Sequence, residues 1–367
     1  MVRFAFWAFR YVKDKKQKMK SRPFGYIVNN LTQDKFIRPN YKLNSLFLIA
    51  FHFCENRIST EGQRRRAKEK KKKKYMNISL FVFRFSFLEK RSTNYEQRFC
   101  ALTYLRTKLS DMSTIHADGS YVKSTIENGV ATIEFFHPKG NAMPGVLLSE
   151  LASAITNASA STDTKVILLR SAGEKAFCAG ASFDELAAVK NEEEGKIFFS
   201  GFANVINAMR KAPQLIVGLI HSKCVGGGVG IAAACDYAIA SEKASVKLSE
   251  LKVGIGPFVI GPAVERKIGT AAFSQMTLDA GNWYTAQWSL EKGLFAEVHT
   301  TDESLYEAVN KKTHELAASS LEAMKEIKKM LWQGTDEWSE LLYDRAAISG
   351  RLVLTEASRT IIKGLIR

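Results

Sequence analysis

The stretch that decides the fold is GGGVGIAAACDYAIAS (226–241), in which three glycines precede a run of small residues and then a short apolar run. The small residues predict a helix over Val229–Cys235, and Tyr237–Ala240 predicts a buried strand directly after it. On the other side of the glycines, the apolar run LIVGLI (215–220) predicts a second buried strand. Strands that alternate with helices in this way are typical of an α/β domain.

The flanking segments extend this pattern. Asn128-Gly129, a strong hairpin signal, joins two predicted strands at 122–127 and 130–136. Short apolar runs predict further strands at 165–170 and 245–248. Apolar residues at core spacing predict helices from near Pro144, at 183–190, at 193–211 and over almost all of the chain past residue 270. We therefore expect one α/β domain over residues 112–367.

The first 111 residues differ in charge from the rest of the chain. They carry 27 Lys and Arg against 8 Asp and Glu, whereas the other 256 residues carry 26 against 29. The net charge of +16 therefore belongs to this segment, and nucleic-acid binding by the domain is not expected. We expect residues 1–111 to be a basic, aromatic-rich extension that is disordered or absent from the mature protein, with Met112 as the true start.

Two functional interpretations of this extension stay open. The run RRRAKEKKKKK (64–74) is typical of a nuclear-localisation or nucleic-acid-binding patch, and residues 1–20 have the composition of a targeting presequence. A real presequence would direct the protein to mitochondria, and without one we expect a cytoplasmic protein. No membrane partner is expected, because no apolar run approaches the roughly 20 residues that span a bilayer.

Cysteine and histidine usage argues against a disulfide scaffold or a zinc module. The five cysteines are an odd set without a C-x-x-C pair, and the six histidines lack ligand spacing. We expect no metal in the functional site.

Three segments carry the groups that suggest chemistry: KAFCAGASFDEL (175–186), HSKCVGGGVGIAAACD (221–236) and SVKLSELKVGIGPFVIG (245–261). In the first segment, a glycine lets the backbone turn sharply and expose the N–H of Ala181. In the second, the helix after the glycines presents free N–H groups and the positive end of its dipole. One donor from each segment would form an oxyanion hole for a carbonyl that gains charge during reaction.

The third segment supplies a carboxylate, Glu250. It follows alternating strand residues and precedes the apolar Leu251, Val253 and Ile255. Apolar surroundings raise the pKa of a carboxyl toward neutrality, which suits a general base that later returns its proton. The residues alone therefore indicate proton abstraction beside a carbonyl whose enolate is held by backbone amides.

Simpler explanations exist for each feature. Gly226–Gly228 can serve close helix–strand packing alone, and Glu250 can be a surface residue at a strand end. We expect Asp236 to cap or pair structurally, and Cys178 and Cys224 to be small buried residues rather than nucleophiles.

A dinucleotide-binding motif is a further alternative. Gly228-x-Gly230-x-x-Ala233 matches its glycine spacing, and Glu242 stands where a ribose-binding acid would be. However, the helix predicted after the glycines is too short for the crossover of a dinucleotide-binding fold.

Four motifs, in this order, resemble the enoyl-CoA hydratase/isomerase (crotonase) family: HPKGNAM (137–143), KAFCAGASF (175–183), GGGVGIAAACDYAIAS (226–241) and SELKVGIGPF (249–258). The resemblance covers about residues 120–367. It implies a crotonase-like ββα spiral with a C-terminal helical trimerisation region, in a homotrimer or a dimer of trimers. Trp332 and Trp338, in the C-terminal helices, would then pack on a neighbouring subunit.

The resemblance also implies the ligand and the residues that hold it. The substrate would be an acyl-CoA thioester, with no separate cofactor, and the oxyanion donors would be the N–H groups of Ala181 and Gly227. Contacts with the substrate or its CoA are implied at Lys139, Ala142, Ala179, Ser182, Phe183, Gly226, Gly230, Pro257 and Phe258.

Two positions near the implied substrate need separate mention. Asp184 stands where some relatives carry a lysine near the CoA phosphates, and Lys139 and Lys175 are alternative phosphate contacts. The segment EEGKIFFSGFANVINAMRK (193–211) borders the acyl pocket in this interpretation, and its phenylalanines either limit the depth of the pocket or belong to the ordinary core: Phe198, Phe199 and Phe202.

One departure from the family pattern sets the expected reaction. Family hydratases carry a glutamate where this chain has Gly230, and a second one where Glu250 stands. A single glutamate is typical of the Δ3-Δ2-enoyl-CoA isomerases of the family. Glu250 would then move a proton from C2 to C4 of a 3-enoyl-CoA. The alternatives are hydration by Glu250 alone, a dehalogenase or thioesterase variant, and a non-catalytic acyl-CoA-binding or RNA-binding member.

Overall fold

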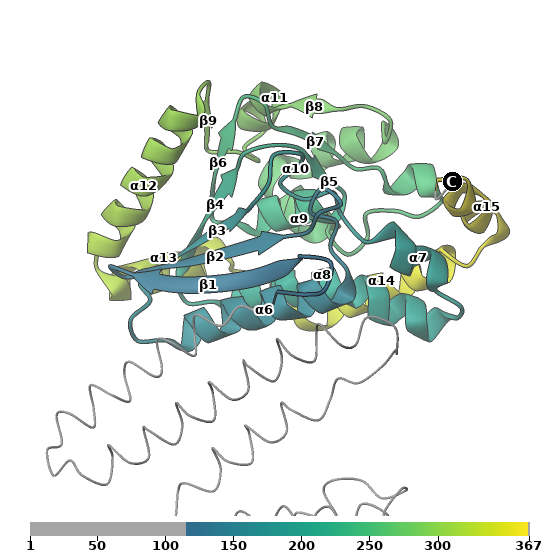
Figure 1. Ribbon diagram of the computed structural model, residues 1–367, viewed down its shortest axis with the longest axis horizontal. Helices are drawn as coiled ribbons and strands as arrows, with labels where there is room; N and C mark the ends of the chain where they lie inside the picture. The colour runs from purple at the N-terminus through teal and green to yellow at the C-terminus, as the bar shows by residue number, and fades with distance from the viewer. Residues whose placement is uncertain (1–114, 366–367) are drawn as a thin grey trace, which may run out of the picture. The chain divides into compact units, whose positions relative to one another are not determined.

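The computed structural model describes residues 115–365 (Figure 1). The expectations for residues 1–111, including the basic run and the presequence, lie outside this range. Among the described residues, no helix is both long and apolar enough to cross a membrane.

A six-stranded sheet forms the centre of the fold, in the order β1-β2-β3-β4-β6-β9. Its strands are β1 (Tyr121–Glu127), β2 (Val130–Phe136), β3 (Val166–Ser171), β4 (Leu215–Ile220), β6 (Tyr237–Ser241) and β9 (Glu297–His299). The first two strands are antiparallel and the remaining neighbours are parallel. The predicted hairpin turn is confirmed, because Asn128 and Gly129 both have positive φ, 50° and 83°.

A second, three-stranded sheet has the order β5-β7-β8. It contains β5 (Cys224–Val225), β7 (Ser245–Lys247) and β8 (Tyr284–Thr285). The expectation that the chain past residue 270 is almost all helical is therefore wrong at β8 and β9. Both strands have only two or three residues, too few for an alternating pattern to show in the sequence.

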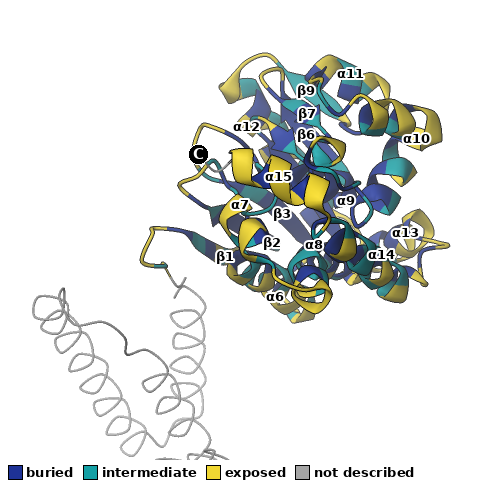
Figure 2. Ribbon diagram, turned by 90° about the vertical axis from the view of Figure 1, so that its right-hand side faces the viewer, coloured by how far each residue is buried: buried dark blue, intermediate teal, exposed yellow. Residues whose placement is uncertain are grey.

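Helices cover both faces of the large sheet (Figures 1 and 2). They are α6 (Gly145–Ala160), α7 (Phe183–Ala188), α8 (Glu192–Lys211), α9 (Gly227–Ala234), α10 (Gly261–Leu278), α11 (Ala286–Glu291), α12 (Asp302–Ala318), α13 (Leu321–Leu331), α14 (Trp338–Leu352) and α15 (Glu356–Leu365), with a 3-10 helix η1 (Glu250–Val253). Strand β3 shows how the two faces are filled. Ile167 and Leu169 belong to the main core with α6 and α8, whereas Val166 and Leu168 pack with Leu305 of α12 on the other face.

The C-terminal helices α13 and α14 pack on their own chain. Trp332 and Trp338 are buried against each other, with ring centroids 5.9 Å apart. Trp332 donates its indole N–H to Asp236, 2.7 Å away, and Lys328 forms a buried ion pair with Asp236 at 2.6 Å. The two tryptophans therefore pack within their own chain, and the expected contact of the C-terminal helices with a neighbouring subunit stays a prediction. The expected structural role of Asp236 is confirmed.

Candidate active site

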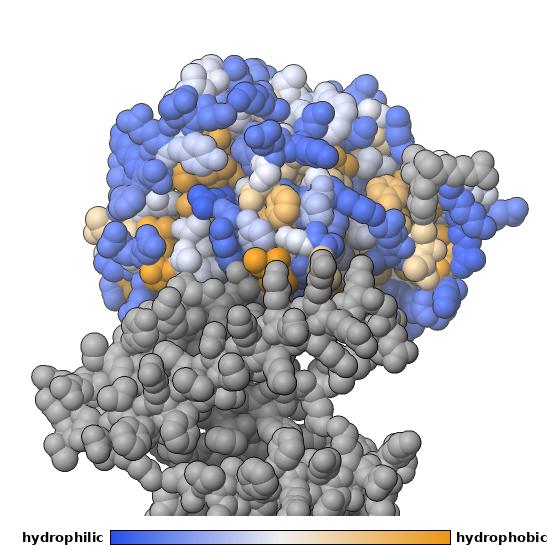
Figure 3. Space-filling model, viewed as in Figure 1, coloured by the Kyte–Doolittle hydropathy of each residue, from blue (hydrophilic) through white to orange (hydrophobic). Residues whose placement is uncertain are grey.

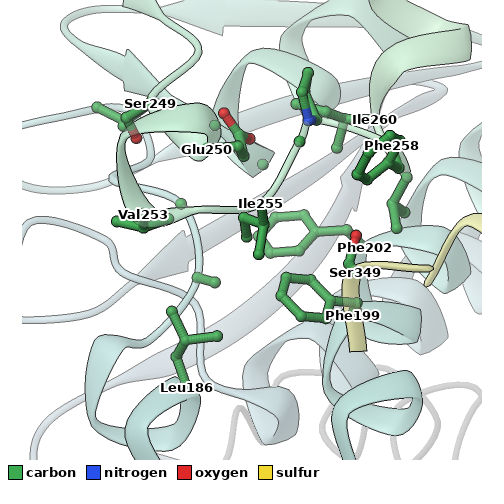
Figure 4. Close-up of a pocket in the computed structure, with 18 of the residues that line it drawn as sticks. Leu186, Phe199, Phe202, Ser249, Glu250, Val253, Ile255, Phe258, Ile260 and Ser349 are labelled. Carbon is green, nitrogen blue, oxygen red and sulfur yellow. The ribbon is translucent and has the colours of Figure 1, made fainter. Parts of the chain in front are cut away.

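A pocket of about 630 Å³, counted out to its open mouth, lies where the predicted segments meet (Figure 4). The loop before α7, the start of α9, η1 and the loop after η1 supply its walls, together with α8 and α14. Its lining is mostly apolar: Ala179, Gly180, Ala181, Phe183, Leu186, Phe199, Phe202, Val225, Gly226, Gly227, Ser249, Glu250, Val253, Ile255, Gly256, Pro257, Phe258, Val259, Ile260 and Ser349. Such a pocket suits an apolar ligand that is oriented by a few polar groups.

Two backbone N–H groups in this lining are free to bind a ligand. The residues on either side of Ala181 bond to the backbone of Met143: the Gly180 carbonyl accepts from the Met143 N–H, and the Ser182 N–H donates to the Met143 carbonyl. The N–H of Ala181 itself has no acceptor within the described part of the chain. Gly227 is the first residue of α9, so its N–H has no partner inside the helix, and no other described residue accepts from it.

The two donor segments are in backbone contact. A β-carbon placed on Gly180 would lie 2.9 Å from the carbonyl oxygen of Val225 and 3.7 Å from the nitrogen of Gly227. Gly180 also has φ +88°, which favours glycine. Glycine at 180 therefore lets the Ala181 and Gly227 amides line one pocket, as the sequence predicted.

Glu250 begins η1 directly after the small sheet, and its carboxylate lies against the glycine turn. A β-carbon on Gly226 would lie 2.7 Å from Oε1 of Glu250. Oε2 of Glu250 is buried and has no hydrogen-bond partner among residues 115–365. Burial without a compensating partner raises the pKa of Glu250 to about 7. The raised pKa is the one that the sequence predicted, and a carboxyl with such a pKa can exchange a proton near neutral pH.

Gly230 does not line the pocket itself, and its Cα–Hα side is directed at Ile260, a residue that does. A β-carbon there would lie 2.5 Å from Cγ2 of Ile260 and 3.6 Å from Cδ1 of Ile206. The space that a second glutamate on α9 would need is therefore filled by apolar side chains.

The structure brings most of the other predicted ligand contacts together. Five of them line the pocket: Ala179, Phe183, Gly226, Pro257 and Phe258. Four do not line it: Lys139, Ala142, Ser182 and Gly230. Lys139 forms an exposed ion pair with Asp184, and the Ser182 hydroxyl caps α7 by accepting from the N–H of Glu185. Both side chains therefore have structural partners in this chain.

Two of the three phenylalanines on α8 face the pocket. Phe199 and Phe202 line the pocket, whereas Phe198 does not. The ring of Phe202 lies directly against Gly227, because a β-carbon on Gly227 would be 2.2 Å from the ring. Figure 4 shows Phe202 between Ile255 and Phe199.

Ser349 is a lining residue that sequence analysis missed. It lies on α14, about 100 residues past the last motif, and reaches the pocket because α14 crosses α8 closely. A β-carbon on Gly195 of α8 would lie 2.6 Å from Cα of Gly350. The sequence does hold a sign of this crossing, namely a glycine inside each of the two helices, at 195 and 350. Glycine at both positions permits the two backbones to approach this closely.

The cysteines near the site have no nucleophilic role. Cys178 and Cys224 are fully buried, and burial raises the pKa of the Cys178 thiol to about 12. A thiol in this state carries almost no thiolate at neutral pH, as predicted for a structural cysteine.

Solved structures identify the fold. The enoyl-CoA hydratase of Bacillus halodurans aligns over 67% of this chain and 100% of its own, with a TM-score of 0.62 and 22% sequence identity. An enoyl-CoA hydratase from Mycobacterium avium subsp. paratuberculosis K-10 aligns over 67% of this chain and 95% of its own, with a TM-score of 0.59 and 23% identity. The chain therefore has the crotonase fold, as the motifs predicted, and the dinucleotide-binding alternative is wrong.

The sequence match establishes the family. The enoyl-CoA hydratase/isomerase family model matches residues 125–365, and the chain belongs to this family.

Its relatives carry out several reactions. A Bacillus subtilis (strain 168) protein named "Probable enoyl-CoA hydratase" is 26% identical over 58% of this chain and 85% of its own. The trans-2-decenoyl-[acyl-carrier-protein] isomerase of Streptococcus mutans is 28% identical over 59% of this chain and 84% of its own. The ethylmalonyl-CoA decarboxylase of Xenopus tropicalis is 26% identical over 41% of this chain and 50% of its own.

Proposed function

We propose that this protein shifts the double bond of a 3-enoyl-CoA to the 2-position, with Glu250 as the single proton carrier. The Glu250 carboxylate takes a proton from C2 of the substrate. The dienolate oxygen rests on the N–H groups of Ala181 and Gly227 while negative charge develops on it. The protonated Glu250 then gives the proton to C4, so the base is regenerated and no other reactant is consumed.

The observation that carries this proposal is that Glu250 is the one carboxyl group among the residues that line this mostly apolar pocket. Addition of water needs a group that positions the water as well as one that exchanges protons, and each such acid or base typically contributes about 10²–10⁴ in rate. In this pocket the face of α9 that would carry the second acid is covered by Ile260. An internal proton transfer needs only the group that is present.

The two amides account for the charge in the transition state. Preorganised N–H donors stabilise a developing oxyanion strongly in a pocket from which water is excluded, and loss of one donor typically costs about 10²–10³ in rate. The thioester class of the substrate follows from the family, since relatives named above act on CoA thioesters or on an acyl-carrier-protein thioester.

The test compares three substrates on the purified full-length chain. Turnover of 3-hexenoyl-CoA should exceed hydration of 2-hexenoyl-CoA and decarboxylation of ethylmalonyl-CoA by at least a hundredfold in kcat/KM. Faster hydration or decarboxylation would overturn the isomerase proposal. Running the assay without added metal or cofactor also tests the expectation that CoA, as part of the substrate, is the only cofactor required. The homotrimer or dimer of trimers stays a prediction, which the mass of the native particle in solution tests.

A further inference from the structure

The helix α15, the last element of the described chain, packs against the wall of the pocket and beside α7 (Figures 1 and 2). Its buried Ile362 belongs to an apolar cluster that includes three residues of the pocket lining: Leu186, Val253 and Ile255. Val253 is the last residue of η1, the 3-10 helix that begins at Glu250. The helix α15 therefore contacts the element that carries the proposed base.

A serine on the same face of α15 binds the end of η1. Ser358 is fully buried, and its hydroxyl donates to the carbonyl oxygen of Gly254 at 3.0 Å. The two residues fit closely, because a β-carbon on Gly254 would lie 2.3 Å from Oγ of Ser358. The hydroxyl of Thr355 in turn donates to Oγ of Ser358 at 3.0 Å, which orients the Ser358 hydroxyl. This contact therefore depends on a glycine at 254 and a hydroxyl at 358.

The backbone connects this contact to Glu250. Gly254 is the C-cap of η1, and its N–H donates to the carbonyl oxygen of Glu250. The four-residue η1 is a single short 3-10 turn, which has little stability of its own. Within residues 115–365, the bond from Ser358 is the only hydrogen bond that joins residues 249–254 to a distant part of the chain. The position of η1 therefore depends on α15.

The carboxylate of Glu250 follows the position of η1. Its Oε2 has no hydrogen-bond partner in the described part of the chain, and its Oε1 lies 2.7 Å from where a β-carbon of Gly226 would be. Packing against the glycine turn, rather than a hydrogen bond to Oε2, therefore sets where the carboxylate lies. A shift of η1 would move it, and a misplacement of about 1 Å can cost roughly 10² in rate.

We propose that Ser358 is a positioning residue, which holds Glu250 in place for proton transfer by fixing the end of η1. The inference rests on the proposed function, from which it takes Glu250 as the proton carrier. Ser358 itself does not line the pocket, so it acts through η1 and not on the substrate. Its loss slows the proton transfer, whereas the amides of Ala181 and Gly227 still bind the thioester.

The first test removes the hydroxyl from the full-length chain. Ser358→Ala should lower kcat for 3-hexenoyl-CoA by about tenfold or more. The affinity for butyryl-CoA, which has no double bond to shift, should change by less than about threefold in calorimetry.

Ser289→Ala is the matched control. Ser289 is also fully buried, and its hydroxyl also donates to a backbone carbonyl, that of Thr285 at 2.9 Å. It lies on α11 and does not line the pocket. We expect this control to lose a similar amount of stability in chemical denaturation and to keep the kcat of the unmodified protein.

A double variant separates positioning from general support of the fold. Because Ser358 acts through Glu250, adding Ser358→Ala to Glu250→Gln should change the residual kcat by less than about twofold. A further tenfold fall in that background would overturn the inference. Thr355→Val provides a milder variant, since it removes the hydroxyl that orients Ser358 and nearly keeps the size of the side chain. It should lower kcat by a smaller factor, and it tests the inference even where Ser358→Ala does not fold.

The remaining outcomes are distinct. An unchanged kcat in Ser358→Ala, or an equal fall in Ser289→Ala, overturns this inference and leaves the proposed function intact. Equal losses of kcat and of butyryl-CoA affinity also overturn it, because the hydroxyl would then support the whole pocket. Faster hydration than isomerisation by the unmodified protein overturns the proposed function, and the same variants then test Ser358 on 2-hexenoyl-CoA. No turnover of either substrate overturns both.

Discussion

A β-carbon on Gly230 would lie 2.5 Å from Cγ2 of Ile260, closer than β-carbons approach other heavy atoms in proteins. Gly230 and Ile260 therefore form a matched pair, in which the absence of a side chain on α9 lets the isoleucine close the pocket wall. This pair decides how many carboxyl groups the site holds.

The first prediction follows from this pair. Gly230→Glu alone should lower the free energy of unfolding by at least 1–3 kcal/mol, the usual cost of overpacking, as measured by chemical denaturation. Combined with Ile260→Gly, the glutamate should fit and add a second carboxyl group. We expect the double variant to hydrate 2-hexenoyl-CoA at least tenfold faster than Ile260→Gly alone. A Gly230→Glu single variant as stable as the unmodified protein would show that the two positions are not in contact.

The second prediction concerns Glu250 as the base. Glu250→Gln keeps the size of the side chain, but the glutamine amide cannot act as a base. We therefore expect kcat for 3-hexenoyl-CoA to fall by about 10²-fold to 10⁴-fold. Binding of butyryl-CoA should change by less than about threefold, since the amides of Ala181 and Gly227 are untouched. Retained turnover in this variant would mean that another group moves the proton.

The same substitution gives a prediction for stability. A carboxyl whose pKa is about 7 in the folded chain and 4.5 when unfolded ionises more readily in the unfolded state. Its ionisation therefore destabilises the fold as pH rises from about 4.5 through 7, and the loss approaches about 3 kcal/mol at higher pH. Glu250→Gln should accordingly be more stable than the unmodified protein at pH 8 and equally stable near pH 4. Denaturation at the two pH values measures this, and the same difference at both would contradict a raised pKa.

The pH dependence of turnover gives a further prediction. Abstraction of the C2 proton requires the ionised carboxylate, so kcat/KM for 3-hexenoyl-CoA should rise tenfold per pH unit below about pH 7 and level off above it. The measurement is an initial-rate profile from pH 5 to pH 9 at constant ionic strength. A profile that is flat down to pH 5 would indicate that Glu250 has an ordinary pKa or is not the base.

Local sequence features predicted the backbone parts of the site well. Gly180 and Gly226 have positive φ, and Gly228 lies close to the backbone of Cys178, so the glycine pattern in the sequence indicated these turns and contacts. The sequence did not show that Lys139 and Ser182 lie outside the pocket lining, because their partners, Asp184 and the N–H of Glu185, depend on how two loops and α7 pack. Ser349 was missed for the same reason, since a helix crossing sets its position.

Phe202 is the residue whose role the sequence left open, and it gives the last prediction. Its ring is buried, lines the pocket and lies directly beneath Gly227, so it limits the space below the thioester. Phe202→Leu should open this end of the pocket and raise the kcat/KM ratio of 3-octenoyl-CoA to 3-hexenoyl-CoA by about tenfold, the usual value of a methylene group or two in an apolar pocket. Phe198→Leu is the matched control, because Phe198 lies on the same helix but outside the pocket. An equal change of the ratio in both variants, or none in Phe202→Leu, would place Phe202 with the ordinary core, where its removal affects stability but not the choice of acyl chain.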